Sequence, residues 1–271
     1  MLEHEASIRI AVFIGLLSLF TLLEWIRPRR KLLYSKTKRW LNNFGLLILD
    51  SIIVRVLFPT AAVGAALFAF ERNIGLLNYF NLRPELSIIL AVLALDFIIY
   101  FQHRIFHQVP ALWRLHRVHH TDLDYDVTTA LRFHPVEILL SMLIKIIAVI
   151  ALGAPPLAVM IFEVILNGTA LFNHSNWKLP IRVDAWLRLF IVTPDMHRVH
   201  HSVKVSETNS NYGFNIPWWD RLFGTYCSQP KAGHLDMTIG IKEFGPEDSI
   251  RIDSLLLQPL LSKPIVKTDR E

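Results

Sequence analysis

Histidines gather in three short stretches of this 271-residue chain, and their spacing is typical of metal ligands. His103 and His107 form an HxxxH pattern. Two HxxHH patterns follow it, at His116, His119 and His120 and at His197, His200 and His201. Residues three or four apart share one face of a helix, so each stretch directs two or three imidazoles the same way. With 12 histidines in the chain, one HxxHH would arise by chance roughly 0.02 times. The spacing therefore predicts a metal site.

The number of imidazoles favours two metal ions over one. Neutral imidazole binds iron, zinc, copper and nickel without bringing charge into the site. The eight histidines of these boxes exceed what one four-coordinate zinc ion can use. They are expected to hold two ions in a shared cage, and a hydrogen-bonded polar cluster is the structural alternative. The boxes contain no Glu between their histidines, whereas zinc peptidases of the HExxH kind need one as general base. Peptidase chemistry is therefore not expected.

Further candidates lie outside the three boxes. His174, in the sequence NHSN, is expected to be a ninth ligand, whereas His134 precedes a proline and could simply close a helix end. Asp96 lies about two helical turns before His103 on the same face. Its carboxylate could accept from a ligand's second ring nitrogen, or make a structural contact within the bundle. Further carboxylates for that supporting role are Asp122, Asp195 and Glu137. His234 stands alone in the tail and is predicted to lie on the surface.

The composition predicts a membrane protein. The chain is 52% hydrophobic, with a mean hydropathy of +0.37. Its apolar residues occur in runs of the length that a bilayer requires, about 20 residues. We expect about four membrane elements, formed by residues 8–26, 43–70, 86–101 and 136–172. The first run is too long for a signal peptide and is expected to remain as a helix. The last contains the sequence GAPP at 153–156, which predicts a helical hairpin.

The charge distribution predicts the orientation. The net charge is +5, and basic residues concentrate between the first two apolar runs at Arg27, Arg29, Arg30, Lys31, Lys36, Lys38 and Arg39. Such a loop is typical of the cytoplasmic side and of contact with anionic lipid, so we do not expect nucleic acid as a partner. With that loop inside, residues 71–85 lie outside and all histidine boxes face the cytoplasm. Asp50 and Arg55, in the second run, are expected to face protein or an interface. Cys227 is alone, which excludes an intrachain disulfide.

The motifs HRIFH, LHRVHHTD, NHSN and DMHRVHHS resemble the histidine boxes of the fatty acid hydroxylase and sterol desaturase superfamily. Residues 211–226, NYGFNIPWWDRLFGTY, are similar to the segment that follows the last box in that family. Residues 119–137 look closest to the alkylglycerol monooxygenase branch and its bacterial relatives. The resemblance covers residues 86–226, about half of the chain.

The resemblance implies a membrane-bound, di-iron, O2-dependent enzyme that hydroxylates or desaturates a lipid, which is a sterol, a fatty acyl chain or an ether lipid. It makes the eight box histidines metal ligands and adds His174 as the ninth. His120 and His201, which end the two HxxHH boxes, are expected to be required for catalysis. The implied cofactors are two iron ions, which zinc can replace, and O2. No fused cytochrome b5 domain is recognised, so a separate electron-donor protein or a reduced pterin is expected as well.

The expected fold is an all-α integral membrane protein with a cytoplasmic helical cap that carries the dimetal site. We expect an N-terminal transmembrane region at 1–85, a hydroxylase-like catalytic domain at 86–226 and a cytoplasmic tail at 227–271. The membrane is a bacterial inner membrane or the endoplasmic reticulum. Two other functions stay open at this point. Metal transport would place ligands along a path near mid-membrane, whereas these boxes flank the apolar runs. A catalytically idle family member would have lost ligands, and all eight are present.

Overall fold

The structure, a computed structural model, describes residues 4–261, and within that range the chain forms helices and no β-strand. The expectation of an all-helical protein is confirmed. Five stretches are long and apolar enough to cross a membrane. They are α1 (Glu5–Ile26), the segment Lys36–Tyr79, α5 (Pro84–Gln108), α7 (Pro135–Leu152) and α8 (Pro156–Asn173).

The last apolar run is a pair of helices, α7 and α8, joined by a tight turn. Gly153 ends α7 in the left-handed conformation, with φ 62°, and Pro156 begins α8. The tip of this hairpin packs against the turn that precedes α4 (Leu76–Tyr79). A Cβ atom on Gly75 would lie 2.1 Å from the Gly153 nitrogen. A side chain would therefore prevent this approach. Both glycines also have positive φ, a backbone conformation that other residues rarely adopt.

The second apolar run, expected as one element, is broken. Helix α2 (Lys36–Leu57) begins before the apolar residues, and α3 (Ala61–Glu71) is a separate helix. Pro59 lies in the break, where it cannot donate a backbone hydrogen bond and disfavours helical geometry at the preceding residue. Phe58 accordingly leaves the helical region, with φ −131° and ψ 70°. Helix α3 then packs against α7 and α8.

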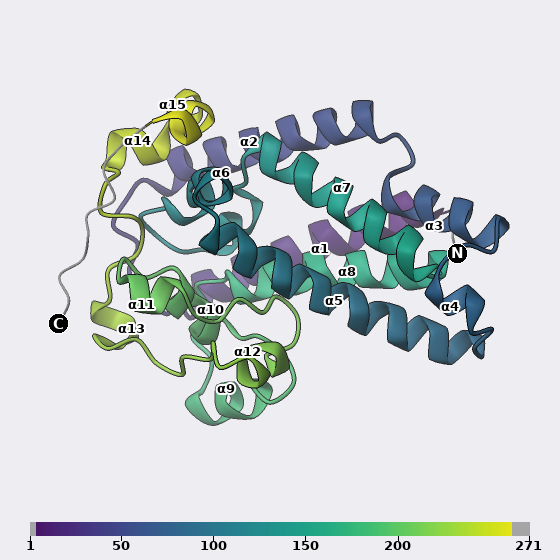
Figure 1. The fold of residues 1–271 in the computed structure, drawn as a ribbon. Helices are drawn as coiled ribbons and strands as arrows, with labels where there is room; N and C mark the ends of the chain where they lie inside the picture. Colours follow the sequence, from purple (N-terminus) through teal and green to yellow (C-terminus); the bar gives the residue numbers. More distant parts are fainter. Residues whose placement is uncertain (1–3, 262–271) are drawn as a thin grey trace.

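The helix ends that carry histidines lie together at one end of the bundle, at the left in Figure 1, and the hairpin tip and α4 lie at the other. Helix α1 packs on α8, α2 on α7, and α5 on α8. Short helices cover the histidine end: α6 (Pro110–His120), η2 (Val127–Leu131), α9 (Ile181–Leu187), α10 (Pro194–His200), α11 (Val205–Thr208), α12 (Trp218–Leu222), α13 (Gly233–Asp236), α14 (Pro246–Ile250), α15 (Ile252–Leu257) and η3 (Gln258–Leu260). We call these helices and their connections the cap.

Part of the basic stretch at 27–39, which runs into the first turn of α2, supports the cap. Arg39 is fully buried, and its guanidinium lies 2.7 Å from Asp122 and 2.5 Å from Asp126. Arg29 lies 3.0 Å from Asp195. A basic loop in contact with lipid was expected here, but these two arginines are held by carboxylates of the cap. The N-terminal helices therefore pack as part of the same body that carries the histidines.

Candidate metal centre

Four helix ends bring the histidines together. Helix α5 supplies two from its last turns, the end of α6 supplies three, the C-cap of α8 supplies one and the end of α10 supplies three. Proline occupies the first turn of all four helices, where its missing N–H costs nothing. Proline thus fixes the residue at which each of these helices begins. The start and the length of the helix together determine the direction in which its histidines point.

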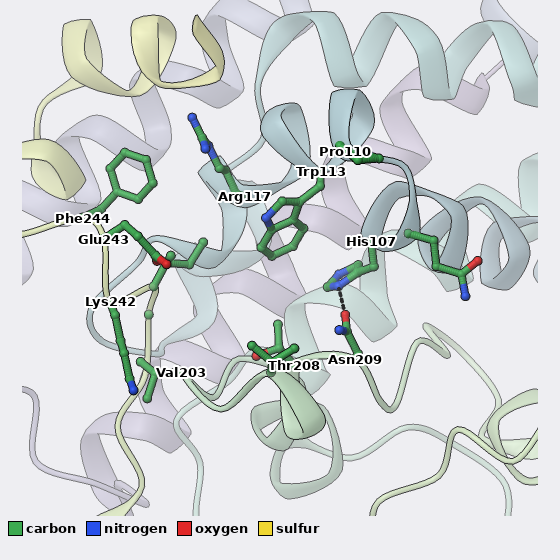
Figure 2. Close-up of a pocket in the computed structure, with 14 residues that line it drawn as sticks. His107, Pro110, Trp113, Arg117, Val203, Thr208, Asn209, Lys242, Glu243 and Phe244 are labelled. Atoms are coloured by element: carbon green, nitrogen blue, oxygen red, sulfur yellow. Dashed lines mark hydrogen bonds between the residues drawn. The ribbon is translucent and has the colours of Figure 1, made fainter. Parts of the chain in front are cut away.

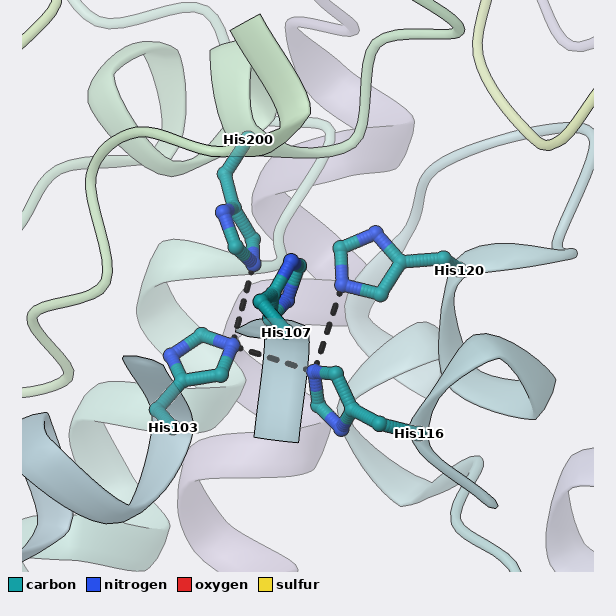
Figure 3. Close-up of side chains that lie close together, drawn as sticks. All are labelled: His103, His107, His116, His120 and His200. Atoms are coloured by element: carbon teal, nitrogen blue, oxygen red, sulfur yellow. Dashed lines mark hydrogen bonds between the residues drawn. The ribbon is translucent and has the colours of Figure 1, made fainter. Parts of the chain in front are cut away.

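The nine histidines form two groups within which the ligand atoms lie within 4.8 Å of one another. The five-histidine cluster consists of His103, His107, His116, His120 and His200 (Figure 3). The four-histidine cluster consists of His119, His174, His197 and His201. His134 and His234 belong to neither group. The structure therefore brings together all the residues predicted as ligands, including His174.

Each HxxHH box is divided between the two clusters. On α6, His116 and His120 are four residues apart and enter the five-histidine cluster, whereas His119 turns to the other. On α10 the assignment is reversed, since His197 joins the four-histidine cluster and His200 the five-histidine one. Each box thus contributes histidines to both clusters, so the two clusters lie side by side, as expected for two ions in a shared cage.

The tautomers of two histidines in the five-histidine cluster point to a cation. His103 Nδ1 lies 2.7 Å from the Tyr212 carbonyl oxygen, and His200 Nδ1 lies 2.6 Å from that of Ser210. A carbonyl only accepts, so both Nδ1 atoms carry the hydrogen and both Nε2 atoms carry a lone pair. These two Nε2 atoms are 3.0 Å apart (Figure 3). Two lone pairs at this distance repel, and a cation bound to both resolves the conflict.

The four-histidine cluster contains the same arrangement. His174 Nδ1 lies 2.8 Å from the Ala170 carbonyl oxygen, and His119 Nδ1 lies 3.2 Å from that of Arg132. Their Nε2 atoms face each other at 3.1 Å. Two imidazole nitrogens bound at about 2.1 Å to one ion, at right angles, would be about 3 Å apart. The spacing in both clusters therefore fits transition-metal ligation.

Other ring nitrogens have no partner at all. Both nitrogens of His197 and of His201 are buried without a hydrogen bond, as is Nε2 of His107. Burial lowers the pKa of His116 to about 3 and that of His174 to about 4. These imidazoles are therefore neutral at physiological pH, which is the form that binds a metal. The donor set fits two transition-metal ions.

Glu137, a low-ranked candidate from the sequence, lies where a ligand's supporting carboxylate belongs. Its Oε1 is 2.6 Å from His116 Nδ1, and the side chain is buried near the start of α7. Among the residues the structure describes, it is the one carboxylate bonded to a histidine of either cluster. Such a partner fixes the tautomer and ring orientation of a ligand.

The other three carboxylate candidates bond elsewhere. Asp96 accepts from Trp219 Nε1 at 2.8 Å, which is the structural contact considered as its alternative. Asp122 accepts from Arg39 and Thr129, and Arg39 lowers its pKa to about 2, against the effect of burial. Asp195 pairs with arginines rather than with a cluster histidine. Their expected support of a ligand is not found.

Two histidines differ from the ligands in their surroundings. His134 caps α7, because its Nδ1 accepts from the Val136 amide at 3.2 Å. The helix-closing interpretation therefore holds for it. His234 was predicted on the surface, and that prediction is wrong: it is 5% exposed. Helix α13 folds against α10, which leaves His234 Nε2 3.7 Å from Asp195. Burial, the largest effect, lowers the pKa of His234 to about 3.

Several contributors to the site carry no sequence signal. Four of the histidines are oriented by backbone carbonyls, which any residue type would provide. The Phe133 ring stacks on His119 at 4.5 Å, and the Tyr125 ring stacks on His174 at 5.6 Å. Asn209 Oδ1 accepts a hydrogen bond from His107 Nδ1 at 3.3 Å. Its place just before the family-like segment at 211–226 was the only available signal.

Two cavities reach the five-histidine cluster. One, of about 290 Å³, lies in the cap between α6, α11 and residues 240–244, and His107 and Trp113 line it (Figure 2). The other, of about 190 Å³, lies among α5, α7 and α8, and His103, His116 and Glu137 line it. Neither cavity is lined by a histidine of the four-histidine cluster. Both of these cavities thus reach the five-histidine cluster.

Comparison with known proteins gives relatives that modify lipids. The chain is 27% identical over 84% of its length to ornithine lipid hydroxylase OlsE of Rhizobium tropici and covers 70% of that protein. It is 31% identical over 58% of its length to human alkylglycerol monooxygenase, of which it spans only 34%. It is 27% identical over 56% of its length to rat cholesterol 25-hydroxylase, of which it spans 52%. No solved structure matches the chain significantly. The sequence model of the family described as fatty acid hydroxylase matches residues 88–225, half of the chain and all nine cluster histidines, and the chain therefore belongs to the fatty acid hydroxylase family.

Proposed function

We propose that this protein is a membrane-bound, O2-dependent lipid hydroxylase with two iron ions, one in each histidine cluster. The observation that carries the proposal is the pair of facing Nε2 lone pairs in each cluster, 3.0 Å and 3.1 Å apart. Imidazole ligation without thiolate suits iron among the redox metals, and zinc can substitute for it. The relatives whose names describe hydroxylases and a monooxygenase favour hydroxylation over desaturation.

The two ions would supply the oxidant that an inert C–H bond requires, by activating O2 with electrons from an external donor protein or a reduced pterin. The protein's own residues supply placement. Glu137 holds the His116 ring, and backbone carbonyls hold four others. The cavity among α5, α7 and α8 admits an alkyl chain to His103 and His116. The cap cavity at His107 gives a reductant its own approach from water.

Metal transport fits the structure less well. Its ligands would follow a path through the apolar helices, whereas both clusters lie at helix ends at one end of the bundle (Figure 1). A catalytically idle protein would lack ligands, and all nine histidines converge.

The direct test uses purified protein, iron, total membrane lipid, a reductant and 18O2, followed by mass spectrometry of the lipids. We expect one 18O atom in the lipid product. His120→Ala and His201→Ala, one from each cluster, should abolish it. Product that forms without O2, or that forms in both variants as fast as in the wild type, would exclude this function.

We further propose that the cap faces the cytoplasm, in a bacterial inner membrane or the endoplasmic reticulum. The support is that the basic stretch lies at the histidine end of the bundle (Figure 1). Tyr79 is 82% exposed at the opposite end. In a Cys227→Ser background, a cysteine in place of Tyr79 should react with an impermeant reagent from outside, and one in place of Gln108 only after permeabilisation. The reverse pattern would invert the orientation.

A further inference from the structure

A cavity of about 300 Å³, lined by apolar side chains and a few charged ones, lies inside the membrane-spanning bundle among α1, α2, α7 and α8. It shares much of its lining, including Ser141, Lys145 and Asn167, with the smaller cavity that reaches His103 and His116. The two form one passage. Side chains of α1 and α2 line its wider part together with those of α7 and α8.

Charged side chains line the wider part of this passage. Lys145 Nζ lies 2.8 Å from Glu163 Oε1, and Arg9 lies 3.0 Å from Glu163 Oε2. Arg9 also pairs with Glu5 at 2.6 Å. A charged residue near the centre of a bilayer costs about 2.5–3.5 kcal/mol on insertion scales, and its presence marks function by default.

These charges favour a neutral ligand over an ionic one. The two cations are already paired with Glu163 and Glu5, so an anionic group would find no free positive charge. Lys145 retains N–H donors beyond the one that Glu163 accepts. Asp50, on the α2 side of the same cavity, is 6% exposed, and its Oδ1 has no hydrogen-bond partner. Lys145 therefore offers a hydrogen-bond donor and Asp50 an acceptor, which together suit a ligand group that both accepts and donates.

The position of Lys145 sets a distance from the metal ligands. Glu137, Ser141 and Lys145 follow one another at four-residue intervals on α7 and so share one face. Eight residues of helix rise about 12 Å. Apolar side chains such as Phe133, Ile138 and Leu166 line the passage along that distance.

We propose that this passage binds the alkyl chain of the lipid substrate and holds a neutral amide or hydroxyl group of that lipid between Lys145 and Asp50. The carbon that is oxidised then lies on the chain, about 12 Å from that polar group. The inference rests on the proposed lipid hydroxylase function, which it makes more specific by naming the substrate class and the region of the chain that reacts.

The test measures binding without turnover. Purified protein in detergent, without reductant, is titrated with hexadecanamide, 1-hexadecanol, methyl hexadecanoate and hexadecane, and complexes are counted by native mass spectrometry. The amide and the alcohol should bind roughly tenfold more tightly than the ester, which only accepts, as expected for one or two net hydrogen bonds. The amide and alcohol arms separate the two sources of the polar group. Equal binding of all four probes would overturn the proposal.

Variants locate the site. Lys145→Met and Asp50→Leu should each remove the preference for the amide and the alcohol, whereas Arg55→Met, at an exposed position of α2 outside the cavity, should retain it. Retention in Lys145→Met would also overturn the proposal. If that variant does not fold, Ser51→Trp should block all four probes and Ile52→Trp, which faces away from the cavity, should not. Unchanged binding in Ser51→Trp would exclude the passage. Because no turnover is involved, selective binding by a protein that fails to hydroxylate would reject the proposed function alone.

Discussion

The two histidine clusters share their ligand chemistry but differ in what surrounds them. Cavities from two directions reach the five-histidine cluster, and His107 is only partly buried. All members of the four-histidine cluster are fully buried, and the rings of Phe133 and Tyr125 stack against two of them. On the proposed function, substrate and reductant would meet the ion of the five-histidine cluster, while the ion of the four-histidine cluster would be enclosed.

The supports of the two clusters differ as well. Glu137 brings a carboxylate to the five-histidine cluster. Beside the four-histidine cluster, the Arg198 guanidinium lies 5.0 Å from the centre of the Tyr125 ring, which stacks on His174. Backbone carbonyls orient His119 and His174. A substitution of Glu137 can therefore remove a support from the five-histidine cluster directly. The backbone carbonyls that support the four-histidine cluster can be displaced only by a substitution that changes the fold around them.

The largest expected effect comes from removing one ligand from each cluster. His116→Ala and His201→Ala should each reduce the metal content from about two ions per chain to about one, because the ligand sets are separate. Each should reduce hydroxylation by roughly a hundredfold or more, above the loss expected for a supporting residue. Elemental analysis and product mass spectrometry measure the two effects.

His134→Ala is the control for this pair, since His134 lies outside both clusters and should keep both ions. Loss of all metal in either cluster variant would show that the clusters are one site and would end the comparison.

Arg39→Met tests the support through the fold. Arg39, in α2, is fully buried and contacts Asp122 and Asp126. Both aspartates lie in the segment that connects α6 to η2. Removing one partner of a buried ion pair leaves charge uncompensated and costs about 3–5 kcal/mol of the free energy of unfolding. Unfolding by denaturant in detergent measures the loss. Lys38→Met, at the exposed neighbouring position, should change stability by less than about 0.5 kcal/mol. Equal losses in both variants would show that the buried network is unimportant.

Glu137→Gln should affect only the five-histidine cluster. Loss of the carboxylate partner of a ligating histidine lowers metal affinity by about 10–100-fold. Competition with a chelator should then show one ion released at lower chelator concentration and one unchanged. Asp96→Asn is the matched control, because Asp96 bonds Trp219 and no cluster histidine. A parallel weakening of both ions in Glu137→Gln would mean that the clusters do not differ in support.

The sequence was sufficient to identify the nine histidines that the structure brings together, but not how they divide between two clusters. Spacing and the NHSN match identify all nine histidines, because helix periodicity directs them to a shared face. Which cluster each joins depends on how α6 and α10 are oriented relative to each other, and no local pattern encodes that. The hairpin was predictable from GAPP at 153–156, since proline and glycine act locally. Arg39 was read as a residue of a lipid-facing loop because its partners lie more than 80 positions away. His234 was misplaced for the same reason, since α13 returns to α10 only in the folded chain.

The smallest expected effect concerns His234, which is buried beside Asp195 on the side of α10 near the four-histidine cluster. In the unfolded chain a histidine takes up a proton near pH 6.5, whereas burial lowers the pKa of folded His234 to about 3. Between these values the unfolded state binds one more proton, so stability falls as the pH decreases, by about 1.4 kcal/mol per pH unit. From pH 7.5 to pH 5.5 the wild type should lose about 1.4 kcal/mol more than His234→Gln. The other buried histidines are common to both proteins, so the difference isolates this residue. Parallel stability curves would mean that His234 is protonated or solvated in the folded protein, and that this side of the four-histidine cluster is open to water.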